Sequence, residues 1–161
     1  LDHDGSVTRI LTGVSTSNGI DLSPDDRLMY YVDTPTGRVD CFDFDVETGT
    51  VRNRRTFVTI PPDQGSPDGL VVDADGHVWV ALWKGGAVHR YAPDGRLDQV
   101  VGFPVTLTTK PAFGGSDLGD LYVTSAWIEL KDDARARQPM AGGVFRLRPG
   151  AKGQRPRRFA G

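Results

Sequence analysis

The chain repeats a series of short strand-like segments, and this repeat limits the folds open to it. One series opens at Asn18, and a second opens in the same order 50 residues later, at Asp68. A third begins about 43 residues further on, near Pro111. Four short strands in every ~40–50 residues is the period of a β-propeller blade. Because a β-sandwich has no reason to repeat in register, we predict an all-β fold, a β-propeller.

The segments inside each series have the composition of strands. They are rich in Val, Tyr, Phe and Trp and alternate with turns of Gly, Pro and Asp. Helical periodicity is nearly absent, and an insertion at Ser125–Ala141 interrupts the third series. The predicted strands include Leu28–Asp33, Arg38–Asp45, Leu70–Val72, Val78–Leu82 and Leu121–Thr124.

The repeat divides residues 1–161 into parts of a propeller. We expect the outer strand of a preceding blade in 1–13 (Ser6–Thr12), blades in 18–58, 68–101 and 110–148, and a tail in 149–161. About three blades cannot close a ring of typically four to eight, and an open ring would leave bare sheet edges. We therefore expect the missing N-terminal half of the ring to come from a longer chain or a second chain.

Charge and hydropathy exclude two classes of partner. The formal net charge is -2, from 19 Lys and Arg against 21 Asp and Glu, so no field favours nucleic acid or an anionic membrane. The longest apolar run, Val78–Trp83, has six residues, whereas a spanning helix needs about 20. The tail is locally basic around Arg157, which indicates a solvated terminus. The lone Cys41 favours a reducing compartment, and we predict a cytoplasmic protein.

Two polar side chains stand at the start of successive series. Equivalent positions on the innermost strands of neighbouring blades face the central channel at one height, so Asn18 and Asp68 can converge there. An amide oxygen and a carboxylate suit a hard cation such as Ca²⁺, Mg²⁺ or Mn²⁺. The alternative is that both are turn residues, because Asn-Gly is a hairpin signal and Asp94 stands in the same Pro-Asp-Gly tripeptide. Only the position in the repeat separates Asp68 from Asp94.

Several segments in order resemble the SMP-30/gluconolactonase/regucalcin-like family: Ser17–Asp25, Tyr30–Thr34, Phe42–Asp45, Asn53–Arg55, Pro67–Asp73, Val78–Ala81 and Leu121–Ser125. The resemblance implies the C-terminal half of a six-bladed propeller that opens sugar lactones. It implies one divalent cation, Ca²⁺ first and Zn²⁺, Mn²⁺ or Mg²⁺ as alternatives, with Asn18 and Asp68 as ligands. The family's third ligand, a Glu near the start of its chain, has no counterpart here, nor do its substrate-contacting Arg and Asn.

The same residues define a hypothesis for the chemistry. Asp68 is the candidate general base for the water that attacks the lactone, and the uncharged Asn18 would fix coordination. Trp83 and Lys84 could form the channel wall, or pack and face solvent, and we expect Lys110 to lie in a loop before the third blade. Two other functions stay open: a non-catalytic metal-binding or protein-interaction propeller, and a related organophosphate or ester hydrolase.

Overall fold

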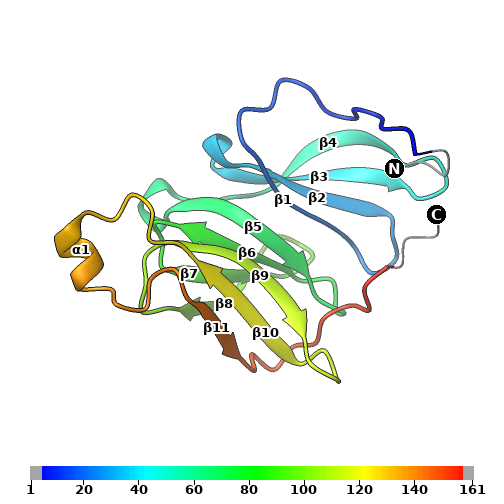
Figure 1. The fold of residues 1–161 in the computed structure, drawn as a ribbon. Coiled ribbons are helices and arrows are strands. Elements are labelled where there is room, and N and C mark those ends of the chain that lie inside the picture. Colours follow the sequence, from blue (N-terminus) through cyan, green and yellow to red (C-terminus); the bar gives the residue numbers. More distant parts are fainter. Residues whose placement is uncertain (1–4, 158–161) are drawn as a thin grey trace.

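The computed structural model describes residues 5–157 of the chain. Its strands form three antiparallel sheets whose strands follow one another in chain order (Figure 1). The first blade consists of β1 (Ser17–Leu22), β2 (Leu28–Asp33), β3 (Arg38–Asp45) and β4 (Thr50–Thr59). The second consists of β5 (Ser66–Val72), β6 (Val78–Trp83), β7 (Ala87–Tyr91) and β8 (Leu97–Gly102). The third consists of β9 (Thr108–Gly114), β10 (Asp120–Ser125) and β11 (Val144–Leu147).

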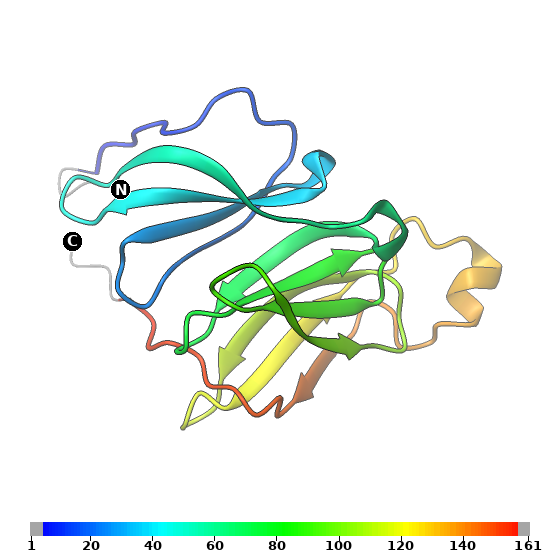
Figure 2. The ribbon, with the colours of Figure 1, turned by 180° about the vertical axis from the view of Figure 1, so that it is seen from behind.

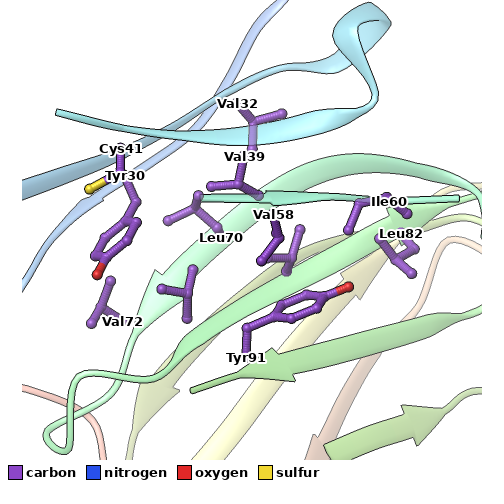
Figure 3. Close-up of a cluster of buried hydrophobic side chains, with 12 residues drawn as sticks. Tyr30, Val32, Val39, Cys41, Val58, Ile60, Leu70, Val72, Leu82 and Tyr91 are labelled. Carbon is purple, nitrogen blue, oxygen red and sulfur yellow. The ribbon is translucent and has the colours of Figure 1, made fainter. Parts of the chain in front are cut away.

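The all-β prediction is confirmed, and the sheets stack as blades of a partial propeller. Strand β6 lies in the middle of this stack and explains the apolar run Val78–Trp83. Val78, Val80 and Leu82 enter a core shared with the first blade, and Leu82 is labelled there in Figure 3. Trp79 and Ala81, which point to the opposite face, enter a core shared with the third blade. Because strand side chains alternate between faces, a strand buried on both faces needs apolar residues at every position.

The innermost strands β1, β5 and β9 lie side by side. A Cβ atom added to Gly19 in β1 would stand 2.6 Å from the backbone nitrogen of Leu70 in β5. One added to Gly69 in β5 would stand 2.6 Å from the carbonyl oxygen of Thr109 in β9. We call the end at which β1, β5 and β9 begin the mouth end, and the end at which they finish the far end (Figures 1 and 2).

The insertion in the third blade lies at the mouth end. It joins the end of β10 to the start of β11 and carries the short helix α1 (Asp132–Ala136), which protrudes there (Figure 1). Its Gln138 accepts a 2.7 Å hydrogen bond from the backbone nitrogen of Thr106. The 3-10 turns η1 (Thr34–Thr36) and η2 (Pro62–Gln64) lie at the same end. Within the described residues, no helix has the length and apolarity that crossing a membrane requires.

The structure corrects the predicted strand at Ser6–Thr12. Residues 5–14 form no strand; instead Leu11 and Val14 pack against the apolar face of the first blade that Met29 and Tyr31 form. A strand needs a neighbour to accept its backbone hydrogen bonds, and the described chain supplies no other strand of a preceding blade. The segment therefore covers an apolar face instead. Residues 1–4 of the predicted segment lie outside the described part of the chain.

The tail agrees in part with the prediction of a solvated terminus: Lys152, Arg155 and Arg157 are exposed, whereas other tail residues pack against the blades. Ala151 is buried in the core between the second and third blades, and Gly153 donates a 2.9 Å backbone hydrogen bond to Leu118. Further on, Arg157 contacts Asp26 and the carbonyl oxygen of Ser23 in the first blade. The described tail thus crosses the far end of all three blades (Figure 1). Basic composition alone did not reveal these contacts of the tail.

Candidate functional site

A β-bulge interrupts each innermost strand at the same place near the mouth end. In β1 the pairing with β2 shifts between Ser17 and Ile20, and in β5 the pairing with β6 shifts between Pro67 and Leu70. In β9 the shift falls at Thr109. A bulge adds a residue to one strand and redirects its side chain. The Asn-Gly and Asp-Gly pairs are therefore bulges inside strands, and the hairpin alternative does not apply to them.

The glycine of each pair is required by the close approach of the strands. Neither Gly19 nor Gly69 has a backbone conformation that excludes other residues; the space beside each is filled by the backbone of the neighbouring innermost strand. Glycine permits such an approach because it has no Cβ atom. The three inner strands can then lie near enough for their bulges to meet.

The structure brings Asn18 and Asp68 together. The Asn18 side chain lies close enough to the Asp68 carboxyl group to lower its pKa, and its amide nitrogen donates a 3.1 Å hydrogen bond to the hydroxyl of Thr34. Both residues are half-buried. Asp94, which has the same sequence motif as Asp68, lies in an exposed turn between β7 and β8 and accepts a hydrogen bond from its own turn at Arg96. Position in the repeat distinguishes the two aspartates, as the sequence analysis expected.

The electrostatics of Asp68 favour a cation nearby. Burial raises the pKa of this carboxyl group, and the nearby Asn18 amide and the charge of Lys110 oppose that rise only in part. A raised pKa means that the ionised carboxylate lacks full compensation in the folded protein. Such a group is a candidate for proton transfer and for cation binding.

Lys110 lies next to this pair, although the sequence indicated a loop residue. It stands in β9, and its side chain passes over Gly69, whose added Cβ atom would be 2.6 Å from the Lys110 Cδ atom. Its ammonium group donates a hydrogen bond to the carbonyl oxygen of Leu70. Partial burial of the ammonium lowers the pKa of Lys110, whereas the charges of Asp21 and Asp68 raise it. The prediction failed because the contact crosses from one blade to the next.

Of the two alternatives for Trp83 and Lys84, the structure shows the second: Trp83 packs and Lys84 faces solvent. Trp83 is half-buried and pairs with Leu107 through an isolated β-bridge. Lys84 is exposed, and its ammonium lies 3.1 Å from the Glu129 carboxylate on the insertion of the third blade. These residues therefore contribute to the surface of the mouth end and connect the second blade to the insertion.

The far end of the inner strands is closed by hydrogen bonds. The Asp21 carboxylate accepts a 2.8 Å bond from the backbone nitrogen of Val72 and joins β1 to β5. The Gln154 amide in the tail donates to the carbonyl oxygens of Leu22 and Val72, at 3.0 and 3.2 Å. Between this tail and Lys110 lies a hollow of about 360 Å³. Hydrogen bonds among β1, β5 and the tail thus hold the far end of the candidate site together.

The donor set fits a hard divalent cation but is incomplete. Within residues 5–157, no group of three or more His, Cys, Asp and Glu side chains could hold a metal ion. Asn18 and Asp68 supply an amide and a carboxylate, which are oxygen ligands of the kind that Ca²⁺ and Mg²⁺ prefer. The described chain thus provides two candidate ligands, and their assigned roles stay predictions.

Comparison with known proteins shows the family. The family model described as "SMP-30/Gluconolactonase/LRE-like region" matches residues 1–127. The chain belongs to this family. Regucalcin of Xenopus laevis is 42% identical over 163 residues, which cover 100% of this chain and 54% of the relative. The chain therefore spans about half the length of the curated relatives it matches.

Solved structures lead to the same family and fold. A calcium-binding protein, regucalcin, from Agrobacterium tumefaciens superposes with a TM-score of 0.87 at 39% identity, covering 93% of this chain and 51% of that one. A gluconolactonase from Xanthomonas campestris superposes with a TM-score of 0.66 at 29% identity, covering 77% of this chain and 39% of that one. The predicted resemblance and the partial propeller are both confirmed.

Proposed function

We propose that this chain forms the C-terminal half of a six-bladed, metal-dependent hydrolase that opens a sugar lactone. The observation that carries the proposal is the convergence of Asn18 and Asp68 from bulges on adjacent innermost strands. The similarity to a gluconolactonase supports the reaction class, and the similarity to a calcium-binding regucalcin supports Ca²⁺ as the cation. The other half of the ring, from a longer chain or a second chain, would supply the third ligand.

The residues of this chain have distinct roles in the proposed reaction. Asp68 takes a proton from the water that attacks the lactone carbonyl, which is the work of a general base. Asn18 lies beside the carboxylate, whose pKa it lowers, and offers an uncharged oxygen ligand. A divalent cation held by these two side chains would polarise the carbonyl and lower the pKa of water. Hydrolysis breaks the ring ester bond and gives a hydroxy acid.

We also propose that the protein works in the cytoplasm. Its lone cysteine, Cys41, is a buried free thiol in the first blade. Structural disulfides are rare in reducing compartments, so such a chain suits one. The substrate is a small molecule that reaches the channel from the mouth end.

The test uses the complete protein that contains this chain. After removal of divalent cations, we expect added Ca²⁺ to restore hydrolysis of a sugar lactone. Asp68→Ala should lower the cation-stimulated rate at least about 100-fold, since both a ligand and the base are removed. The matched control is Asp94→Ala, which alters the same Pro-Asp-Gly motif in an exposed turn and should leave the rate unchanged.

Other outcomes would contradict the proposal. Equal rates for Asp68→Ala and the unaltered protein would remove Asp68 from the site. Bound cation without turnover of any lactone would favour a non-catalytic metal-binding propeller. Turnover of organophosphates or simple esters, but not of sugar lactones, would favour the related hydrolase. An intact-mass measurement of the native protein would show whether one chain or two complete the ring.

A further inference from the structure

The ammonium group of Lys110 lies deeper in the channel than the candidate cation ligands. The hydrogen-bond acceptor of Lys110 is the carbonyl oxygen of Leu70, two residues beyond Asp68 on a strand that starts at the mouth end. The side chain reaches this position across Gly69, which has no Cβ atom to block it. The ammonium is therefore below Asp68 as seen from the mouth end.

The charges of two carboxylates act on this ammonium. The charges of Asp68, toward the mouth end, and Asp21, toward the far end, both act on it. Asp21 already accepts hydrogen bonds from the backbone nitrogens of Leu22 and Val72, whereas burial leaves the Asp68 carboxylate without full compensation. Lys110 thus supplies a positive charge that compensates Asp68 in part.

We propose that Lys110 is a positioning residue that sets the cation affinity of the channel: it occupies the place of a counter-ion to Asp68 and weakens the binding of a divalent cation. This inference rests on the proposed function, because it assumes that Asn18 and Asp68 hold the cation. Like charges repel with an energy that scales with the product of the charges, so a divalent ion is disfavoured twice as strongly as a monovalent one. Lys110 acts through Asp68 and is not proposed to touch the substrate.

Calorimetric titration of Ca²⁺ alone into the cation-free complete protein tests the proposal. Lys110→Met keeps an unbranched stem and removes the charge, and it should tighten Ca²⁺ binding at least about tenfold. Lys110→Arg keeps the charge and should stay within about threefold of the unaltered protein. Lys152→Met removes an exposed lysine near the far end and should leave the affinity unchanged. Equal affinity for Lys110→Met and the unaltered protein, or an equal gain in Lys152→Met, would overturn the proposal.

A second measurement needs no bound metal and separates this inference from the proposed function. Without cation, Lys110→Met should lower the melting temperature while Asp68 is present and should have little effect in a protein that also carries Asp68→Asn. Additive effects of the two substitutions would overturn the inference. Absence of Ca²⁺ binding in the unaltered protein would contradict the proposed function alone, provided that the two substitutions are coupled.

Discussion

The two ends of the innermost strands use similar polar residues in different ways. At the far end, Asp21 and Gln154 bond to backbone groups of β1 and β5. At the mouth end, the Asn18 amide donates to the hydroxyl of Thr34, and burial raises the pKa of Asp68. The polar groups at the far end therefore form hydrogen bonds that connect the blades, whereas those at the mouth end are available to a ligand.

This difference separates stability from function along a single strand. The carboxylate of Asp21 accepts hydrogen bonds from two main-chain nitrogens and is therefore part of the hydrogen-bonded framework of the fold. The carboxylate of Asp68 costs the fold free energy, because desolvation outweighs its partners. A group that the fold holds at a cost is a candidate for function.

The largest expected effect is the loss of the close approach between β5 and β9. In Gly69→Ala, the new Cβ atom would meet the carbonyl oxygen of Thr109 at 2.6 Å, and backbone cannot move aside as a side chain can. We expect the free energy of unfolding of the complete protein to fall by about 2–3 kcal/mol in denaturant titration. This result would show that the close backbone packing at the mouth end stabilises the fold, although the polar side chains there do not.

Gly102→Ala is the matched control, because a Cβ atom there would meet nothing within 4 Å. Its free energy of unfolding should stay within about 0.5 kcal/mol of the unaltered protein. If Gly69→Ala were equally harmless, the inner strands would not lie as close as described.

A smaller effect is expected at the far end. Asp21→Asn keeps the shape of the side chain but replaces one acceptor of the Leu22 and Val72 nitrogens with an amide donor. We expect the free energy of unfolding to fall by about 1–2 kcal/mol, whereas Ca²⁺ affinity should change less than about threefold. Calorimetry and denaturant titration on the same preparation would measure both. A loss of Ca²⁺ binding without a loss of stability would reverse the assignment of the two ends.

The smallest effect is a dependence of stability on pH that Asp68 causes. Its folded-state pKa lies above its ordinary value of 3.8, so ionisation destabilises the fold. The cost is absent below the ordinary value and develops as the pH rises through the raised one. Without cation, Asp68→Asn should therefore melt at the same temperature as the unaltered protein near about pH 3. At neutral pH it should melt higher by about 1–3 °C. A lower melting temperature for Asp68→Asn at neutral pH would show that this carboxylate stabilises the fold, as Asp21 does.

Much of the architecture could be predicted from local patterns. The strand segments Leu28–Asp33 and Arg38–Asp45 have the same bounds in the structure, because apolar alternation and turn residues act over a few positions. Asn18 and Asp68 could be paired because the repeat places equivalent residues on neighbouring strands. The conformation of Ser6–Thr12 could not be predicted in this way. The same composition is compatible with a strand that has a partner and with an irregular segment that covers an apolar face.

The sequence by itself determined the blades, their order and the two oxygen side chains that open successive blades. Those features follow from periodicity, which local chain geometry fixes. Only the tertiary structure decided that Lys110 reaches across Gly69 to the carbonyl oxygen of Leu70 and that the tail crosses the far end at Gln154. Both are contacts between residues distant in the chain, and they depend on how closely neighbouring blades approach. No local pattern encodes that distance, because it is set by the packing of side chains between complete sheets.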